Sequence, residues 1–333
     1  MLDIDQNIQL LKNGSSLTTK ESDLFQMVRT VCTDFTPNVV ARAAGGWVRD
    51  KLLGRPSDDL DIAVENTTGL IFAEHLQRYI KSISTEKETS QSKIVVIKAN
   101  PDQSKHLQTA RVCLFSNFWV DICGLRSDTY ATDSRIPSNI KQGTPIEDAK
   151  RRDFTINALF FNINTNTLED YVNGVADLKQ GILRTPLDAE ISFGDDPLRI
   201  LRAFRFASRF GFQLDESILP ASRQVSKEFK RKITRERIVT ELTKAIESST
   251  EPETVIEYLV ESNLFLNVFD VDDSWHLEEN EAYQRVLTVM QRRDYEPQAQ
   301  YDYFNRPNEQ PFEFRPGFFK TDLNDKKLVM ILA

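Results

Sequence analysis

GGWVRDKLLGRPSDDLDIAV, residues 45–64, places a glycine pair shortly before a group of three aspartates that leads into an apolar stretch. Residues 60–64 read as a β-strand. Side chains alternate along a strand, so Asp59 and Asp61 project to one side, while Asp58 points away and can occupy the preceding turn. Neighbouring carboxylates repel each other unless a cation lies between them. The pattern therefore predicts that Asp59 and Asp61 chelate a divalent metal.

The glycine pair adds the second half of this hypothesis. Gly45 and Gly46 allow backbone amides to approach an anion closely, and Arg49 offers the fork geometry that suits a phosphate. The alternative is a surface turn that carries acidic residues by chance, since glycine pairs and aspartate pairs are each common alone. Both features together favour a site for a metal and a phosphorylated ligand.

Composition narrows the kind of metal and the kind of protein. A chain of 333 residues with 40% apolar residues is long enough for two domains or more. It contains no apolar run long enough for a transmembrane helix, and its first residues resemble neither a secretory signal nor a transit peptide. Three scattered cysteines favour a reducing compartment, and three scattered histidines argue against a zinc site. We therefore expect a hard ion held by carboxylates, Mg²⁺ in particular.

The charge of the chain is unevenly distributed. The net charge is −8, yet residues 199–244 contain twelve basic residues against five acidic ones. This segment is a candidate surface for phosphate groups on an otherwise acidic protein. A solvated helical face is the alternative interpretation.

Periodicity and turn residues divide the chain into a mixed part and a helical part. The expected helices in the first part are 18–34, which Thr18 and Glu21 open with capping-box spacing, a short one near 48–53, and 70–83. The expected strands are 39–44, 60–64, 94–98, 109–115, 118–124, 159–163 and 167–171, and the last two form a hairpin around residues 164–166. Residues 126–148 read as a long mobile loop. Helices are expected at 198–210, 232–246 and 253–262.

These elements predict an α+β fold: a head with a mixed, largely antiparallel sheet, followed by an all-α neck and an incomplete body. The expected divisions are an N-terminal helical segment over 1–35, a catalytic head over 36–186, a helical neck over 187–262, and the start of a helical body over 263–333. The last residues, KKLVMILA, stop inside an apolar helical run, so we expect further C-terminal sequence in the natural protein.

An ordered series of motifs resembles a known family. Gly45-Gly46-x-x-Arg49-Asp50 followed by Asp59-x-Asp61 resembles the signature of the DNA polymerase beta superfamily of nucleotidyltransferases. More narrowly, the series is similar to the class II CCA-adding tRNA nucleotidyltransferases and their bacterial poly(A) polymerase relatives. The sequence of the motifs is most like that of eukaryotic, fungal-like members. It continues through VDICGLRSDTY (120–130), EDAKRRDFTINALFFNI (147–163), GVADLKQGILRTP (174–186), DDPLRILRAFRFASRFGF (195–212) and ITRERIVTELTKAI (233–246).

The resemblance implies roles for several residues. It makes Asp59 and Asp61 the catalytic, magnesium-binding pair and Asp121 a candidate third carboxylate. The block around Arg152 and Asp153 is used in the family to hold the incoming nucleotide and its sugar; a capping cluster on a structural turn is the alternative. The loop of residues 126–148 falls where relatives have a flexible element.

The segment DDPLRILRAFRFASRF has a physical reading of its own. Its arginines recur every three or four residues and form, with Asp196, one stripe down a helix, so they need anions near them. An Asp–Arg pair presents acceptors and donors in one plane, as reading the edge of a base requires. The resemblance assigns base selection to Asp196 and Arg199. Arg202 and Arg205 support that pair or contact phosphate, whereas Asp195 replaces a glutamate common in bacterial members. A salt-bridged face is the alternative reading.

The implied activity is template-independent addition of CCA to the 3′ end of tRNA from CTP and ATP. The implied partners are the tRNA acceptor arm, ATP and CTP, with no membrane, and the implied location is the cytoplasm and nucleus, with a mitochondrial form as an alternative. Three other enzymes remain alternatives, because they share these motifs: a specialist that adds only CC, one that adds only A, and a poly(A) polymerase. An inactive tRNA-binding protein is the alternative from another class.

Overall fold

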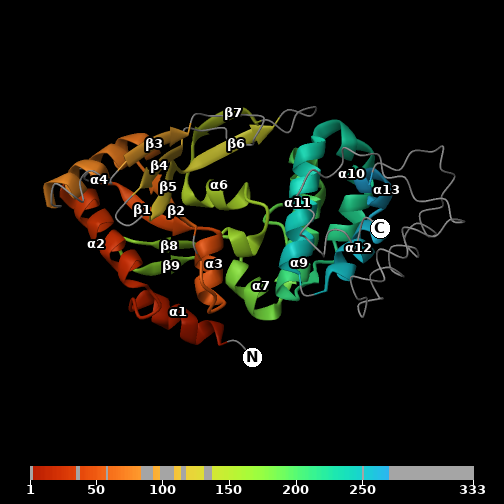
Figure 1. Cartoon of the computed structure of the whole chain (residues 1–333), viewed down its shortest axis with the longest axis horizontal. Coiled ribbons are helices and arrows are strands. Elements are labelled where there is room, and N and C mark those ends of the chain that lie inside the picture. Colours follow the sequence, from red (N-terminus) through yellow and green to blue (C-terminus); the bar gives the residue numbers. More distant parts are fainter. Residues whose placement is uncertain are drawn as a thin grey trace, which may run out of the picture. The chain divides into compact units, whose positions relative to one another are not determined.

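The computed structural model describes residues 3–34, 38–57, 59–83, 93–97, 109–113, 118–130, 137–249 and 251–269. Contacts divide the chain into two compact units, Met1–Asp196 and Pro197–Ala333. Figure 1 gives the position of each labelled element along the chain. The finer division expected from the sequence, with its boundary near residue 186, stays a prediction, and most of the expected body lies outside the described residues.

The first unit contains the mixed α and β elements. Its helices are α1 (Ile4–Lys12), α2 (Thr19–Asp34), α3 (Gly46–Leu52), α4 (Gly69–Ile83), α6 (Pro145–Lys150), α7 (Gly174–Gln180) and α8 (Ala189–Asp195), with a 3₁₀ turn, η3, at Thr155–Asn157. Its strands are β1 (Val40–Ala44), β2 (Leu60–Glu65), β3 (Lys93–Ile97), β4 (Thr109–Cys113), β5 (Trp119–Gly124), β6 (Arg126–Tyr130), β7 (Pro137–Gln142), β8 (Phe160–Asn162), β9 (Thr167–Glu169) and β10 (Ile182–Leu183).

Seven of these strands form one sheet in the order β3-β4-β5-β2-β1-β8-β9. All neighbours are antiparallel except β2 and β5, which run parallel. The expected mixed, largely antiparallel sheet is therefore confirmed. The parallel pair matters most for the site, because it sets Asp61 directly beside Asp121.

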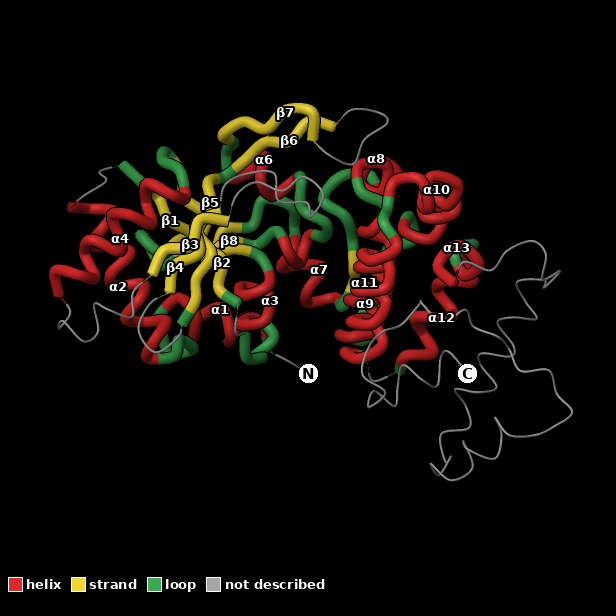
Figure 2. The backbone as a smooth tube through the Cα atoms, turned by 45° about the horizontal axis from the view of Figure 1, so that its top comes forward, coloured by secondary structure: helices red, strands yellow, loops and turns green. Residues whose placement is uncertain are grey.

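The two faces of the sheet differ as the alternation along β2 requires. Ile62 and Val64 are fully buried, whereas Asp61 is exposed. Figures 1 and 2 both show α2 and α4 on one side of the sheet, and these helices supply buried apolar side chains such as Phe72. Burying an aromatic side chain of this size contributes about 2–3 kcal/mol. The other face also has a small buried cluster, which includes Ala63 and Ala149, but Asp61 at the start of β2 stays exposed.

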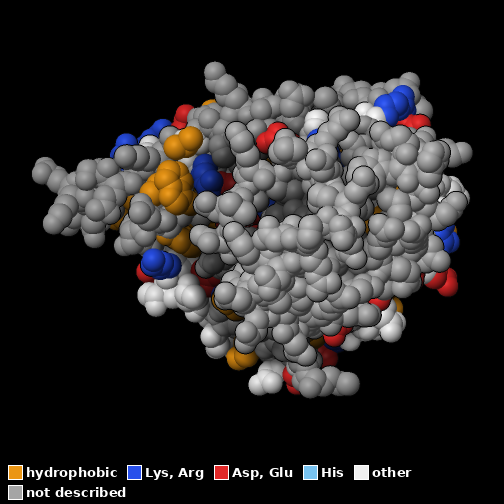
Figure 3. All heavy atoms as spheres, turned by 45° about the vertical axis from the view of Figure 1, so that its right-hand side comes forward, with side chains coloured by type: hydrophobic (Ala, Val, Ile, Leu, Met, Phe, Trp, Pro, Cys, Tyr) orange, Lys and Arg blue, Asp and Glu red, His pale blue; other side chains and the backbone are white. Residues whose placement is uncertain are grey.

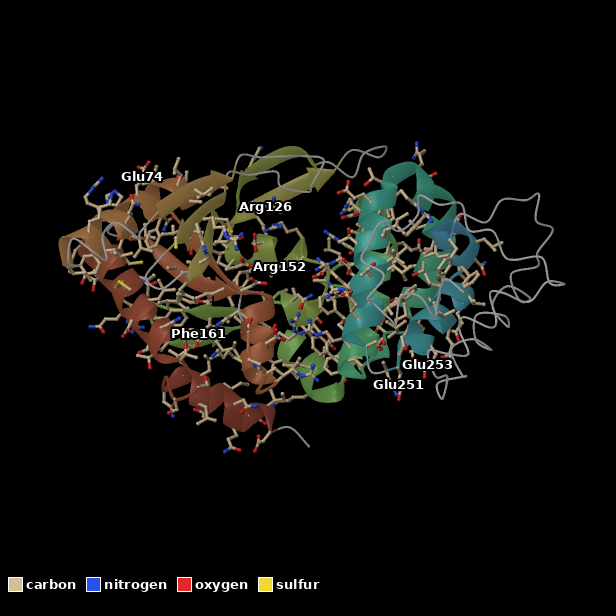
Figure 4. The ribbon with its side chains drawn as sticks, viewed as in Figure 1. Glu74, Arg126, Arg152, Phe161, Glu251 and Glu253 are labelled. Atoms are coloured by element: carbon tan, nitrogen blue, oxygen red, sulfur yellow. The ribbon has the colours of Figure 1, made fainter. Side chains whose placement is uncertain are left out.

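An aromatic cluster joins α2, α3 and β8 beneath the glycine turn. The ring of Phe25 lies 5.5 Å from that of Trp47 and 6.0 Å from that of Phe161, which Figure 4 labels. All three side chains are almost completely buried. The start of α3 is thus fixed to the sheet by packing as well as by its own hydrogen bonds.

A buried carboxylate completes this attachment. Glu21 accepts hydrogen bonds from the indole of Trp47 and the ammonium of Lys51, both at 2.7 Å, and from the amide of Thr18. The capping box expected at the start of this helix is confirmed, since Thr18 also accepts from the Glu21 amide. Burial alone would raise the pKa of Glu21, but these donors outweigh it and hold the pKa below the ordinary value.

Replacing Glu21 by glutamine is expected to destabilise the fold by about 3 kcal/mol, because the variant leaves the Lys51 ammonium buried without its charge partner. The unfolded chain binds a proton at this residue more readily than the folded one, so the contribution is present at neutral pH and is lost as pH falls through the folded pKa. Chemical denaturation between about pH 3 and 7 measures this. If the variant has the same free energy of unfolding as the wild type, and the same loss of stability at acidic pH, Glu21 does not have this stabilising role.

Residues 126–148 do not form a long loop, and that expectation was wrong. β6 and β7 pair as an antiparallel hairpin, and α6 follows directly. Thr144 and Glu147 form a capping box around Pro145, which occupies the first turn of the helix. Proline and glycine had suggested a loop, but Pro145 starts a helix here and Gly143 allows a close backbone approach to Arg126. Residues 131–136 lie outside the described part.

The second unit is helical where it is described. It contains α9 (Leu198–Phe210), the short strand β11 (Gln213–Leu214), α10 (Ile218–Lys232), α11 (Arg235–Ser248), α12 (Pro252–Glu261) and α13 (Phe265–Phe269). The helices expected at 198–210 and 253–262 are confirmed. The one expected from residue 232 instead begins at Arg235, and α10 was not anticipated. Among the described residues of the whole chain, no helix combines the length and apolar character needed to cross a bilayer.

Candidate active site

Three carboxylates meet where β2 and β5 run side by side. Asp61 and Asp121 are paired positions in these parallel strands, so their side chains leave the same face of the sheet. Asp59 directly precedes β2 and is near enough to act on the charge of Asp61. The structure therefore brings together the pair and the third carboxylate named from the sequence.

The charge state of Asp61 reflects this crowding. Although the residue reaches solvent, its carboxylate lies among enough protein atoms to lose hydration, and this is the main cause that raises its pKa to about 6. Repulsion from Asp121 and Asp59 raises the pKa further, while Arg152 and Arg111 oppose the shift. The site is thus short of positive charge in a way that a bound cation would relieve.

The residues present fit a magnesium ion. Within the described ranges, no cluster of three or more His, Cys, Asp or Glu side chains is arranged to hold a metal by itself. Mg²⁺ is usually bound by one or two carboxylates together with waters and substrate phosphates, rather than by a full protein cage. Asp59 and Asp61 supply such a partial set of hard oxygen ligands. The raised pKa of Asp61 reflects negative charge at the site that is not fully balanced by positive charge.

The glycine turn lies between β1 and α3. Gly45 has a φ of 70°, and its amide donates to the Leu159 carbonyl at 3.0 Å. A β-carbon added to Gly45 would stand 2.8 Å from Nη1 of Arg152, and one added to Gly46 would stand 3.4 Å from Nη2 of Arg49. Both glycines therefore leave room for arginine side chains, which the sequence did not indicate.

Arg49 is more enclosed than expected of a phosphate contact. Its guanidinium is buried, forms two hydrogen bonds to Asp50 at 2.8 and 3.0 Å, and donates to Oδ1 of Asn157. Asn157 in turn donates to Oδ1 of Asp153 at 3.0 Å. The contact of Arg49 with a triphosphate stays a prediction, and the role shown here is to tie α3 to the 3₁₀ turn.

Arg152 lies beside the carboxylates. Its guanidinium sits 4.9 Å from the ring centre of Phe160, and Ala44 pairs with both Phe160 and Asp61, so all of these lie on the same sheet face. Nη1 of Arg152 donates to the Asn157 carbonyl at 3.1 Å. Figure 4 shows Arg152 next to α6, close to Arg126. Arg152 is thus in a position to contact an anion that binds beside these carboxylates.

The segment from Asp195 to Arg205 is built differently from the single stripe expected. Asp195 is the last residue of α8, Asp196 follows it in an extended conformation, and α9 begins only at Leu198. Placing Asp196 on the helix was wrong, because the residue before a proline is disfavoured in helical geometry and Pro197 starts a new helix. Arg199 is buried and Arg202 is half-buried on α9.

Arg205 has a partner that the sequence did not suggest. It forms a buried ion pair with Glu241 of α11, and its guanidinium also lies 4.1 Å from the ring centre of Phe206. On the face shown in Figure 3, exposed basic and acidic side chains stand next to one another in several places. Independently of that view, Arg231 and Glu228 of α10 form an exposed ion pair. Nucleotide and phosphate roles for Arg199, Arg202 and Arg205 stay predictions.

Comparison with known proteins agrees with this architecture. Residues 41–184 match the family model described as the Poly A polymerase head domain. A Thermotoga maritima CCA-adding enzyme, solved in complex with tRNA, is 25% identical with a TM-score of 0.64, covering 91% of this chain and 70% of that one. The mixed sheet, with aspartates on parallel neighbouring strands beside the glycine turn, thus has the fold of this class of nucleotidyltransferases.

Two curated relatives narrow the family. The tRNA nucleotidyltransferase cca2 of Schizosaccharomyces pombe is 43% identical over 236 residues, which are 69% of this chain and 48% of the relative. The mitochondrial CCA tRNA nucleotidyltransferase of Saccharomyces cerevisiae is 47% identical over 212 residues, which are 63% and 38%. Residues 41–184 therefore resemble a Poly A polymerase head domain, and the chain is similar to these tRNA nucleotidyltransferases over about two thirds of its own length. It spans about half the length of the curated relatives it matches.

Proposed function

We propose that this protein adds CCA to the 3′ end of tRNA from CTP and ATP, without a nucleic-acid template and with release of pyrophosphate. The main observation that supports this proposal is the pairing of Asp61 with Asp121 on adjacent parallel strands, beside Asp59 and Arg152. Similarity to tRNA nucleotidyltransferases supports the same reaction. The proposal extends to Mg²⁺ as the metal and to tRNA as the acceptor.

The chemistry is an in-line displacement at phosphorus. The terminal hydroxyl oxygen of the tRNA attacks the α-phosphorus of the nucleotide, the bond to the pyrophosphate oxygen breaks, and the hydroxyl proton is lost to solvent. When bound, Mg²⁺ lowers the pKa of the attacking hydroxyl and neutralises charge on the leaving group. Asp59 and Asp61 are the ligands for the ion. Little covalent work falls to the protein, so positioning and charge stabilisation set the rate.

The other residues orient the substrates in this scheme. The Gly45–Gly46 turn admits the triphosphate close to the backbone, and Arg152 neutralises its charge. Asp196 and Arg199 select the base by presenting an acceptor and donors to its edge. Basic side chains of α10 and α11 hold the acceptor arm through its phosphates and shape. For the cellular location, we propose the cytoplasm and nucleus. The mitochondrial S. cerevisiae relative named above supports a mitochondrial form as well.

The reaction predicts which tRNA ends are extended. Transcripts that end before CC should accept C from CTP, those that end in CC should accept one A from ATP, and complete transcripts should accept neither. Pyrophosphate release should require Mg²⁺ and disappear with a chelator. Chain length after incubation with each nucleotide separately measures this.

Other outcomes would point to the alternatives. Repeated A addition to every transcript would identify a poly(A) polymerase, and extension of only one incomplete end would identify a CC-adding or A-adding specialist. Binding of tRNA with no pyrophosphate release under any condition would indicate a non-catalytic binding protein.

A further inference from the structure

Asp148 is a buried acidic residue that the scheme above does not use. It lies on α6 and is only 1% exposed. Its Oδ2 lies 3.0 Å from both Nε and Nη2 of Arg152, and its Oδ1 accepts from Nε of Arg151 at 2.8 Å. The backbone amide of Arg126 donates to the same Oδ1 at 3.3 Å. Aspartate is almost never buried to this extent unless it is paired, so these contacts explain why it is tolerated.

The helix that carries Asp148 is fixed at its start. The Thr144–Glu147 capping box and Pro145 define its first turn. Arg151 and Arg152 lie three and four residues beyond Asp148, just past the last helical residue, Lys150, and both pair with its carboxylate. Neighbouring residues therefore supply both arginines, and the Arg126 amide is added from a more distant segment.

Asp148 keeps its charge in this setting. Burial would raise its pKa, but the positive charges of Arg152 and Arg151, together with the hydrogen bonds from Arg151 and the Arg126 amide, outweigh burial and lower it. An ionised acceptor makes stronger and better-directed hydrogen bonds than a neutral one. The carboxylate is thus a permanent acceptor for the guanidinium of Arg152.

Together these contacts hold the guanidinium of Arg152 on three sides. One edge lies against Asp148, Nη1 donates to the Asn157 carbonyl, and one face lies over the Phe160 ring. The contacts occupy three of the five N–H groups of a guanidinium and leave the others for a ligand. The charge of Arg152 also acts on Asp61, so the guanidinium lies near a carboxylate proposed to bind the metal.

We propose that Asp148 is a positioning residue for nucleotide binding: its carboxylate fixes Arg152 in the orientation that receives the phosphates of the incoming nucleoside triphosphate. This inference rests on the proposed function, because it takes Arg152 as the nucleotide contact. A purely structural buried ion pair would give the same burial and distances, but it would affect only stability. The two roles therefore differ in nucleotide affinity measured on folded protein.

The test is a double-mutant cycle on CTP binding by titration calorimetry without tRNA, at a temperature well below the unfolding midpoint of every variant. Asp148→Asn keeps the shape and removes the charge, and it should weaken CTP binding about tenfold or more, the effect expected of a misplaced contact. In an Arg152→Ala background the same change should cost less than about twofold, because the residue it acts through is gone. In an Arg151→Ala background the tenfold effect should persist.

Glu169→Gln is the matched control. Glu169 is a half-buried carboxylate of β9 that accepts hydrogen bonds from Arg42, Asn162 and Tyr171, none of which is proposed to bind the nucleotide. It should lower the unfolding midpoint and leave CTP affinity unchanged.

The outcomes separate this inference from the proposed function. Equal losses from Asp148→Asn with and without Arg152, or a lower unfolding midpoint with unchanged CTP affinity, would overturn the positioning role, as would a wild-type chain that binds no CTP. If the cycle behaves as expected but no tRNA end is extended, the positioning role stands and CCA addition fails.

Discussion

Asp61→Asn is expected to abolish nucleotide addition, with a loss of at least about a thousandfold. Charge stabilisation by a bound metal contributes several kcal/mol to such a transition state, and each 1.4 kcal/mol is about tenfold in rate. The fold should survive, because the change removes one charge from among Asp59 and Asp121 and leaves the shape intact. The unfolding midpoint without metal is expected to be unchanged or raised.

Two measurements on the same preparation test this result. Pyrophosphate release gives the activity, and a thermal melt with and without Mg²⁺ gives the stability. Asp23→Asn is the control, since Asp23 is an exposed residue of α2, on the helical side of the sheet. Normal turnover in Asp61→Asn would remove the metal assignment. A melting temperature of Asp61→Asn far below that of the wild type would instead show that Asp61 has a structural role.

Gly45→Ala is expected to cost about a hundredfold in nucleotide affinity, because a group held only slightly out of place can lose that much. The backbone at Gly45 has a φ of 70° and a ψ of −127°, a conformation that L-residues with a side chain rarely adopt. The new β-carbon would also stand 2.8 Å from Nη1 of Arg152. That side chain cannot simply yield, because Asp148 and Asn157 hold it.

Gly14→Ala separates backbone strain from the displacement of Arg152. Gly14 has a φ of 80°, but the nearest atom to an added β-carbon is Cδ1 of Leu17 at 4.0 Å. Both variants should lose stability in chemical denaturation because both positions have a positive φ, whereas only Gly45→Ala should lose CTP affinity. Equal CTP affinity in the two variants would show that the glycine turn does not control the position of Arg152.

The sequence was sufficient to predict the sheet and its carboxylates. Alternation along residues 60–64 separates Asp61 from the buried Ile62 and Val64, and that separation is a local property of any strand. The capping box of Thr18 and Glu21 likewise predicts where α2 begins. Such features depend on residues that are near each other in the chain.

Long-range partners could not be predicted in this way. The pairing of Arg205 with Glu241 joins two helices, and the enclosure of Arg49 by Asn157 joins segments far apart in sequence. Nothing in the spacing of the arginines distinguishes a buried ion pair from a contact with phosphate. The ion pairs of Asp148 could have been predicted, because the two arginines follow this acid by three and four residues, at the end of a capped helix. Proline and glycine nearby had favoured a loop instead.

The most direct test of the metal site is a crystal of this chain soaked with Mn²⁺ and CTP and measured for anomalous scattering. The account predicts a peak about 2.1 Å from carboxylate oxygens of Asp59 and Asp61. It also predicts the nucleotide phosphates beside that peak, within reach of Arg152. Density for CTP with no peak at these aspartates, or with the metal held by other residues, would contradict it.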